Sequence, residues 1–270
     1  MGRAANPYTR VTEVASFVNA GWKEYWYKSI EKGTKENPVG LIELTARECV
    51  EFSKTAHTAE EWKAFLENKT ALKEADRISR ESTEFGKGVH HIAESHLLKR
   101  PIGNSWSDDS GNVHPLTERQ KFSGGLITKW CDDAKVKPIE VTGITGIKMP
   151  AIEIELISEE HKIVGHPDLI NSFGEDPTIW ITDWKTSKEC RIEYVLQLAA
   201  YAHMLWEKYR IPCDNGAIIR TPSDPNVFPQ FETHTFTNLR TKYFPLFLEA
   251  LDVVNFFKKK GKWKELKVAA

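Results

Sequence analysis

The spacing of apolar residues predicts helices in the first part of the chain. From residue 58 onward, apolar side chains recur every three or four positions, as on one face of a helix. Thr58 is the expected N-cap, because Glu61 follows three residues later in the arrangement of a capping box. Gly86 and Gly88 predict either a break or a close packing contact before a second helix over 87–99.

After residue 150 the pattern changes to that of strands. The stretch "AIEIELI", residues 151–157, alternates apolar and polar positions with the period of a strand. "KIVGHPDLINSF", residues 162–173, is expected to return as its hairpin partner, distorted at Pro167, which cannot donate a ladder hydrogen bond. A third strand is expected over 178–184. The other expected elements are a loop over 101–115, helices over 117–135, 192–210 and 237–260, the last capped by Thr237 or Asn238 and bent at Pro245, and strands over 216–221 and 231–236.

This order of elements predicts an α/β fold with a central mixed β-sheet flanked by helices, together with an N-terminal helical region. We expect residues 1–80 to form the helical region, packed on a core of residues 81–270 that ends in a helix and a basic tail. The tail, residues 258–267, carries six lysines around Trp263 and is either a solvated end or a DNA contact. Aromatic residues of the helical region either stack on bases or fill the core; they are Trp22, Tyr25, Trp26 and Trp62.

Composition excludes several classes of protein. Lys and Arg number 37 against 38 Asp and Glu in 270 residues, so any contact with nucleic acid must come from local patches rather than from a basic surface. The four cysteines lie far apart and include no C-x-x-C pair, which argues against a zinc ribbon or a redox dithiol. The first residues contain no apolar leader segment, and no apolar run approaches membrane-spanning length. An intracellular, soluble protein is expected, cytoplasmic in a bacterial or phage-infected cell, with no membrane partner.

The stretch "TIWITDWK" carries the first candidate chemistry. In a strand, Ile179, Ile181, Asp183 and Lys185 share one face, so a carboxylate and an ammonium continue a face that is otherwise apolar. Burying such groups is costly unless they are paired or bind a ligand. A simple ion pair at the strand end is one interpretation. The other involves Asp168 on the preceding strand, because two adjacent carboxylates repel unless a cation such as Mg2+ or Mn2+ lies between them.

These residues also resemble a known family. "PD" at 167–168 and "DWK" at 183–185 are similar to the PD-(D/E)xK nuclease signature. "GKGVHHIAE", residues 86–94, and "QLAAY", residues 197–201, look like the histidine motif and the Q-x-x-x-Y motif of its RecB-like branch. The resemblance covers roughly residues 80 to 205 and implies the restriction-endonuclease-like fold of that superfamily.

The resemblance implies a role for each matching residue. Asp168, Asp183, His90 and the backbone carbonyl of Trp184 would bind one or two Mg2+ or Mn2+ ions. Lys185 would orient the attacking water or stabilise the phosphate in the transition state. Gln197 and Tyr201 would line the cleft and hold the DNA strand or the lysine. Glu94 and Glu153 are further candidates, and Glu153 would reach the metal through water.

The residues alone leave alternatives open at several of these positions. His91 competes with His90, and Glu155 competes with Glu153. Gln197 and Tyr201, four residues apart on one helix face, could equally be packing residues with a polar tip. An iron–sulfur cluster, which some relatives carry on four cysteines, is not expected, because only Cys213 follows Tyr201. The resemblance therefore points to cluster-free relatives, such as mitochondrial genome-maintenance and phage-type exonucleases.

The expected function is that of a metal-dependent DNA exonuclease that acts on DNA ends or single strands in replication, recombination or repair. Two alternatives are a structure-specific endonuclease of the same fold and a DNA-binding protein without catalytic activity. The polarity of digestion, the preference for single or double strands, the choice of DNA over RNA, the oligomeric state and a protein partner in replication or recombination are left open.

Overall fold

A computed structural model describes residues 8–18, 50–55, 58, 60–61, 64–65, 70–108, 110–143 and 146–259. Contacts within the chain divide it into two compact units, one of residues 1–19 with 85–270 and the other of residues 20–84. The boundary expected near residue 80 stays a prediction. The four N-terminal aromatic residues with a possible base-stacking role lie outside the described residues, as does most of the lysine-rich tail.

The larger unit is built on a five-stranded mixed sheet, which confirms the expected fold class. Its strand order is β12-β11-β10-β9-β4, in which β10 and β11 run parallel and the other neighbours run antiparallel. The strands are β4 (Val136–Pro138), β9 (Leu169–Phe173), β10 (Asp176–Lys185), β11 (Asn215–Arg220) and β12 (Glu232–Phe236). Because β10 lies in the middle, the polar residues at its end are placed inside the unit rather than at a sheet edge.

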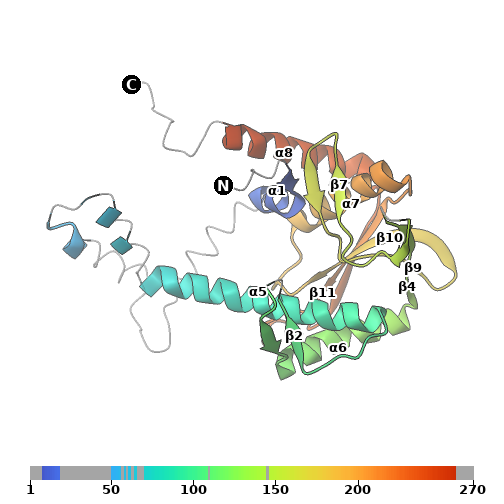
Figure 1. Ribbon diagram of the computed structural model, residues 1–270, viewed down its shortest axis with the longest axis horizontal. Helices are drawn as coiled ribbons and strands as arrows, with labels where there is room; N and C mark the ends of the chain where they lie inside the picture. Colours follow the sequence, from blue (N-terminus) through green and yellow to red (C-terminus); the bar gives the residue numbers. More distant parts are fainter. Residues whose placement is uncertain are drawn as a thin grey trace. The chain divides into compact units, whose positions relative to one another are not determined.

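Helices cover both faces of this sheet (Figure 1). Alternate strand residues such as Ile181 and Ile218 face a cluster formed with α1 (Val11–Val18), α7 (Ile192–Tyr209) and α8 (Phe244–Lys259). The intervening residues, among them Trp184 and Ile219, face a second cluster formed with α5 (Thr70–Leu97) and α6 (Glu118–Asp133). The period-two face assignment expected for β10 is therefore the one observed.

Short strands complete the unit. β1 (Thr9–Arg10), β8 (Ile163–Gly165) and β7 (Leu156–Ser158) form a three-stranded sheet in the order β1-β8-β7. Two hairpins pair β2 (Ser105–Ser107) with β3 (Val113–Pro115) and β5 (Glu140–Thr142) with β6 (Lys148–Pro150). A short π-helical turn (Leu239–Tyr243) precedes α8. The loop expected over 101–115 thus contains a hairpin that its polar sequence did not indicate.

One of the two alternatives for the glycines in α5 is wrong. The helix runs without a break from Thr70 to Leu97, so Gly86 and Gly88 do not interrupt it. They are instead sites of close packing: a Cβ atom on Gly88 would collide with the side chain of Gln120, and one on Gly86 would lie 3.4 Å from Thr186 Oγ1. The lack of side chains therefore brings α5 close to α6 and to the end of β10.

The strand expected over 151–157 is also wrong over most of its length. Only Ile152 makes an isolated bridge, to Leu169, before β7 begins at Leu156. Glu153 adopts a positive φ of 50°, a left-handed conformation that interrupts a strand. Its partner stretch is likewise divided, into β8 and β9, on either side of Pro167, where a distortion was expected.

The expected helix caps have different outcomes. The capping box at Thr58 is confirmed, since the Thr58 N–H donates to the Glu61 carboxylate at 2.7 Å and the Glu61 N–H donates to Thr58 Oγ1 at 3.2 Å. Asn238 is the N-cap residue of the π-helical turn that precedes α8, but its side chain makes no capping hydrogen bond. No helix in the described part of the chain combines the length and the apolar character that crossing a membrane requires.

Candidate active site

The candidate residues of the larger unit converge where β10 ends. Asp168 follows β8, and its Oδ2 accepts a hydrogen bond of 2.6 Å from the Trp184 backbone N–H. This bond joins the "PD" segment to the "DWK" strand at a fixed register. His90 is brought to the same point by α5, where its Nε2 lies 3.2 Å from the Trp184 carbonyl oxygen. Three stretches that are distant in sequence therefore meet at one residue of β10.

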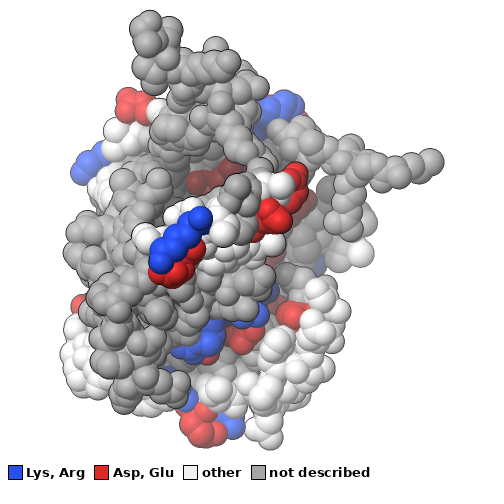
Figure 2. All heavy atoms as spheres, turned by 90° about the vertical axis from the view of Figure 1, so that its left-hand side faces the viewer, with Lys and Arg blue, Asp and Glu red and all other residues white. Residues whose placement is uncertain are grey.

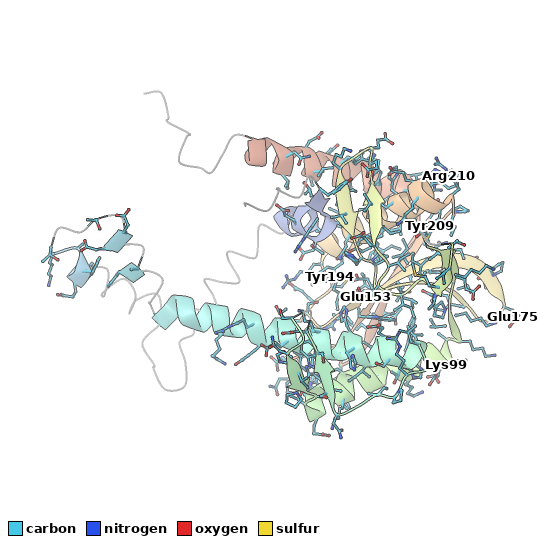
Figure 3. The ribbon with its side chains drawn as sticks, viewed as in Figure 1. Lys99, Glu153, Glu175, Tyr194, Tyr209 and Arg210 are labelled. Carbon is cyan, nitrogen blue, oxygen red and sulfur yellow. The ribbon has the colours of Figure 1, made fainter. Side chains whose placement is uncertain are left out.

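A group of three side chains at this point has the donor atoms that a metal ion requires. His90 Nδ1 lies 3.4 Å from Asp168 Oδ1 and 3.7 Å from Glu153 Oε1. The ligand atoms of His90, Glu153 and Asp168 all lie within 4.8 Å of one another. Figure 3 labels Glu153 near the middle of the view, away from Glu175 at the opposite end of the sheet. Two carboxylates with one imidazole form a donor set that suits a divalent cation.

Interactions among His90, Asp168 and Glu153 shift the pKa of each of these side chains. Burial would lower the pKa of His90, but the charge of Asp168 and hydrogen bonds to Asp168 and Glu153 raise it to about 10. Burial likewise opposes ionisation of Asp168, but the charge of His90 outweighs it and lowers the pKa of this carboxyl group. The Glu153 side chain is 41% exposed, yet desolvation of its carboxyl group and repulsion by Asp168 raise its pKa to about 7. Without a metal ion, a protonated His90 therefore supplies the cation between the carboxylates.

Asp183 and Lys185 form an ion pair beside this group. Lys185 Nζ contacts Asp183 Oδ2, and the Asp183 side chain is 1% exposed. Burial and the charge of Asp168 raise the pKa of Asp183 to about 6, although Lys185 opposes the shift. Burial would lower the pKa of Lys185, but the charges of Asp183 and Asp168 outweigh it and raise that pKa. Lys185 also lies over the ring of Tyr194, 5.1 Å from its centroid.

The ion pair with Lys185 leaves Asp183 able to bind a further cation. The buried Asp183 Oδ2 atom contacts the Lys185 ammonium, and no other donor among the described residues reaches it. A buried carboxylate is costly in free energy unless cations or hydrogen-bond donors compensate its charge. Together with the raised pKa of Asp183, it fits a site whose carboxylates are completed by a bound cation.

Gln197 and Tyr201 interact with each other on α7. Gln197 Nε2 donates a hydrogen bond of 2.8 Å to Tyr201 Oη, and both side chains are buried. Burial and the charge of Asp183 raise the pKa of Tyr201 well above its ordinary value. A Cβ atom on Gly165 would lie 2.5 Å from the Tyr201 ring, so this glycine allows β8 to approach the helix. The two side chains are thus a packed, hydrogen-bonded part of the core, and the charge of Asp183 acts on the hydroxyl group of Tyr201.

The structure distinguishes between the residues that compete for a place in the metal site. Glu94 lies one turn beyond His90 on α5 but forms an ion pair with Arg100 at 3.7 Å. Glu155, the alternative to Glu153, lies 3.7 Å from His166. Neither belongs to the three-residue donor group, whereas Glu153 does. His90, rather than His91, is the histidine whose ring contacts the carboxylates.

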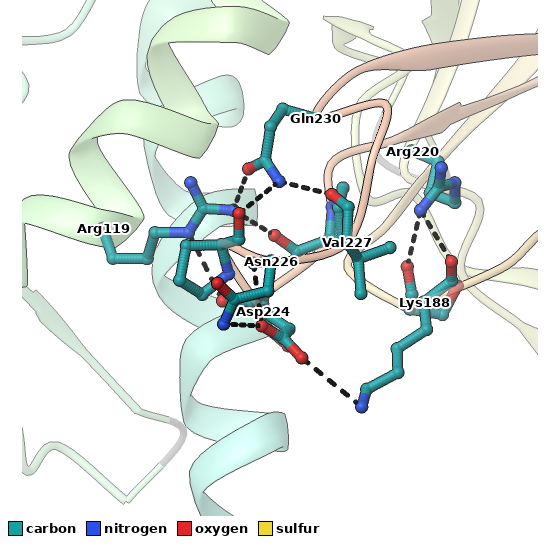
Figure 4. A network of polar contacts seen from close by, with 11 residues as sticks. Arg119, Lys188, Arg220, Asp224, Asn226, Val227 and Gln230 are labelled. Carbon is teal, nitrogen blue, oxygen red and sulfur yellow. Dashed lines mark hydrogen bonds and ion pairs between the residues drawn. The ribbon is translucent and has the colours of Figure 1, made fainter.

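Two arginines that the sequence interpretation missed hold the loops that follow β10 and β11 (Figure 4). Arg220 is 2% exposed and donates to the backbone oxygens of Ser187 at 3.3 Å and Lys188 at 2.9 Å, while it pairs with Glu232 at 2.5 Å. Arg119 on α6 donates to the backbone oxygens of Pro222 at 2.6 Å and Ser223 at 3.3 Å. The available signal was the position of Arg220 in the otherwise apolar strand "GAIIR", where a charged residue needs a partner.

Charge on the described surface is mixed rather than concentrated. On the face drawn in Figure 2, described Lys and Arg side chains lie beside Asp and Glu side chains. Exposed pairs of this kind include Lys129 with Asp133 and Lys162 with Glu159. This pattern fits the near-zero net charge of the whole chain.

Comparison with known proteins gives one family. The profile of the PD-(D/E)XK nuclease superfamily matches residues 61–225, a range that contains every candidate site residue. No curated protein matches the sequence. Among solved structures, the crystal structure of SSO0001 is similar with 16% sequence identity and a TM-score of 0.30, over 50% of this chain and 58% of that chain. The match thus spans less than two thirds of that protein.

Proposed function

The chain belongs to the PD-(D/E)XK nuclease superfamily, and on that premise we propose that it is a divalent-metal-dependent DNA exonuclease of the RecB-like branch. It would hydrolyse phosphodiester bonds at DNA ends or in single strands, in replication, recombination or repair. The observation that carries the proposal is the convergence of His90, Asp168 and Glu153 beside the buried Asp183–Lys185 pair.

The residues at this point fit a divalent metal ion. Asp168, Glu153 and His90 would hold it, with Asp183 next to them and the Trp184 carbonyl oxygen within reach of His90. When bound, Mg2+ or Mn2+ supplies Lewis-acid chemistry to a phosphodiester group and a water molecule. The burial of Asp183 and the repulsion between Asp168 and Asp183 support such a site, because both raise the pKa of Asp183 and both effects are relieved by a cation.

Lys185 is the residue best placed to act on the substrate. Its raised pKa keeps the ammonium charged at neutral pH. A fixed positive charge in a buried position stabilises negative charge that develops on a phosphate, and more strongly than it would in water. Asp183 and the ring of Tyr194 fix the position of the ammonium group. We therefore assign charge stabilisation and positioning of the attacking water to Lys185.

Gln197 and Tyr201 would support this centre from α7. Their mutual hydrogen bond uses one Gln197 donor and fixes the Tyr201 hydroxyl group. The charge of Asp183 raises the pKa of Tyr201, which supports a position of the Tyr201 hydroxyl group close to the acidic residues of the site. The assignment to the RecB-like branch rests on the order of these motifs: a histidine helix, Asp168, the D-x-K strand and a Q-x-x-x-Y helix.

Digestion of labelled DNA tests the proposal. End-labelled linear single strands, linear duplexes and circular DNA are incubated with the full chain in Mg2+, Mn2+ or EDTA. Asp183→Ala and Lys185→Ala are compared with Asp176→Ala, which removes an exposed carboxylate from the other end of the same strand.

We expect metal-dependent loss of linear DNA with circular DNA intact, loss of activity in the first two variants and normal activity in Asp176→Ala. Cleavage of circular DNA would replace the exonuclease with an endonuclease. Binding without cleavage under all metal conditions would favour the inactive DNA-binding protein.

A further inference from the structure

A second group of metal-ligating side chains lies at the C-terminal half of α7. His203 and Glu207, four residues apart, lie on one face of this helix. Glu160 and His161 come from the turn between β7 and β8. The ligand atoms of Glu160, His161 and His203 all lie within 4.8 Å of one another, and His203 Nε2 lies 3.9 Å from Glu207 Oε2. We propose that these four residues bind a zinc-type transition-metal ion that joins the β7–β8 turn to α7.

Two atoms of this group are buried without hydrogen bonds. His203 Nε2 and Glu207 Oε2 have no hydrogen-bond partner in the described residues, although each is closed off from solvent. Buried polar atoms are almost always satisfied, and an unsatisfied pair costs free energy. A cation between His203 and Glu207 would satisfy both atoms at once.

The donor atoms are held in place before any ion binds. The His203 ring stacks on Phe244 with centroids 3.8 Å apart and an interplanar angle of 9°. The His161 ring lies edge-on to both rings, with centroids 5.1 Å from His203 and 5.4 Å from Phe244. Glu207 Oε1 accepts hydrogen bonds from the backbone N–H groups of Glu159 at 3.1 Å and Glu160 at 3.4 Å. These contacts leave Oε2 of Glu207 free to face His203.

The chemistry of the four donors selects the type of metal ion. Two imidazoles and two carboxylates form a nitrogen- and oxygen-donor set that suits Zn2+, in contrast to the carboxylate-rich active site. Zn2+ binds the neutral imidazole, and no hydrogen-bond partner among the described residues occupies the buried Nε2 atom of His203. Tetrahedral ligands with bonds of about 2.1 Å lie about 3.4 Å apart. The 3.9 Å separation of His203 and Glu207 thus needs only a small side-chain adjustment.

An ion at this position would fix a segment that leads to the active site. The β7–β8 turn is followed by β8, which ends three residues before Asp168. On the other side, α7 carries Gln197 and Tyr201, which precede His203 in the same helix. The proposed ion is therefore structural: it cross-links two elements that position candidate catalytic residues and takes no part in the reaction.

Zinc titration in an active-site variant tests this proposal separately from the nuclease. The double variant His90→Ala/Asp168→Asn removes two of the three donors of the first group, so that remaining binding reports on the second. Isothermal titration with Zn2+ should give one ion per chain, and Co2+ in its place should show the visible absorption of a four-coordinate nitrogen–oxygen site. The result does not depend on whether the protein cleaves DNA.

Two variants added to this background locate the ion. His203→Phe keeps the ring stack on Phe244, and Glu207→Gln keeps an oxygen for the two backbone N–H groups. Each should weaken Zn2+ binding by more than about 10-fold. The amide introduced by Glu207→Gln can donate to His203 Nε2, so the metal-free melting temperature should rise while its increase with Zn2+ disappears. His96→Ala, which removes a histidine paired with Asp132 elsewhere on the surface, is the matched control.

The outcomes separate the proposal from its alternatives. Folding of each variant is checked by circular dichroism and by the metal-free thermal transition. Absence of Zn2+ binding in the background variant would overturn the proposal, and so would binding that both His203→Phe and Glu207→Gln leave unchanged. Equal loss of binding in His96→Ala would show non-specific association with surface histidines and would also overturn it.

Discussion

His90 Nε2 lies 3.2 Å from the backbone carbonyl oxygen of Trp184, while its Nδ1 faces Asp168 at 3.4 Å. Both ring nitrogens therefore have an oxygen partner, which favours the doubly protonated imidazolium. The raised pKa of about 10 agrees with this geometry. A metal ion held by Nδ1 would leave the Nε2–H bond to Trp184 in place, where it orients the ring.

Metal binding should therefore release a proton from His90. At pH 8.5, between the Glu153 pKa of about 7 and the His90 pKa of about 10, the carboxylates are ionised and His90 carries a proton. Metal needs the neutral imidazole, so the apparent affinity for Mn2+ should rise by up to about 10-fold per pH unit below pH 10. Titration calorimetry in two buffers of different ionisation enthalpy measures the release. Equal apparent enthalpies in both buffers would contradict the prediction.

The same pKa shift has a consequence for the stability of the metal-free protein. Because the folded-state pKa of His90 is raised, its contribution to stability is complete below about pH 6.5, the ordinary histidine value, and is lost as the pH rises through 10. A His90→Ala variant should lose the corresponding part of the pH dependence of unfolding. Metal-free denaturant unfolding from pH 6 to pH 10 compares the two proteins.

Adjacent glycines of α6 should respond in opposite directions to alanine. A Cβ atom on Gly124 would lie 2.7 Å from two atoms of Ile92 on α5, whereas one on Gly125 would meet no atom within 4 Å. Gly124→Ala should destabilise the fold by about 1–3 kcal/mol through overpacking. Gly125→Ala should stabilise it by about 0.5–1 kcal/mol, because alanine is the better helix former.

Denaturant unfolding of both variants checks this pair, with DNA cleavage as a second readout. Displacement of α5 by Gly124→Ala should also reduce activity, since that helix carries His90. Similar free energies of unfolding for Gly124→Ala and Gly125→Ala would show that α5 and α6 pack less closely than the structure indicates.

Tyr201→Phe should destabilise the protein because it leaves a buried donor unpaired. Gln197 Nε2 would lose its 2.8 Å bond to the tyrosine hydroxyl group. The expected cost is about 1–3 kcal/mol in the free energy of unfolding. Tyr209→Phe, on the same helix but only partly buried, should change stability by less than about 0.5 kcal/mol. If the free energies of unfolding of Tyr201→Phe and Tyr209→Phe differ by less than about 0.5 kcal/mol, the result would argue against the hydrogen bond.

Arg220→Met should reduce both stability and activity. The change removes the cation from Glu232 and the donors from the Ser187 and Lys188 carbonyl oxygens. Breaking a buried pair costs about 3 kcal/mol, and the loop after Lys185 loses its anchor. Arg240→Met removes a more exposed pair, with Asp214 at 3.0 Å, and should cost less than about 1 kcal/mol. Thermal unfolding and cleavage assays on both variants test the contrast.

The sequence pattern was sufficient where local periodicity decides the outcome. Alternation along β10 placed Asp183 and Lys185 on one face with Ile181, as observed, because the period of a strand does not depend on its neighbours. In "AIEIELI", residues 151–157, the alternation predicted correctly which side chains are buried, but it did not predict the pairing of the backbone with other strands. Ala151, Ile154 and Leu156 are buried and Glu153 and Glu155 are exposed, although most of this stretch is not a strand.

Other features depended on residues far away in the chain. Gly88 could indicate a helix break or a close contact, and only the position of Gln120 on α6 decides between them. Glu153 and Glu155 were equivalent in the pattern until the left-handed backbone at Glu153 directed one of them to His90. The position of Arg220 in an apolar strand indicated that it needs a partner, but not which one, because two of its partners are backbone oxygens on a loop more than 30 positions earlier.

The contact between His90 and Trp184 also joins two positions 94 residues apart, and Glu153 and Asp168 lie in the interval between them. Closing so long a loop is a non-local event that typically comes late in folding. During translation, the site formed by His90, Asp168 and Asp183 cannot be complete before the D-x-K strand has left the ribosome. A chain released early would carry His90 without its partners, so an interrupted synthesis would yield a product without an assembled hydrolytic centre.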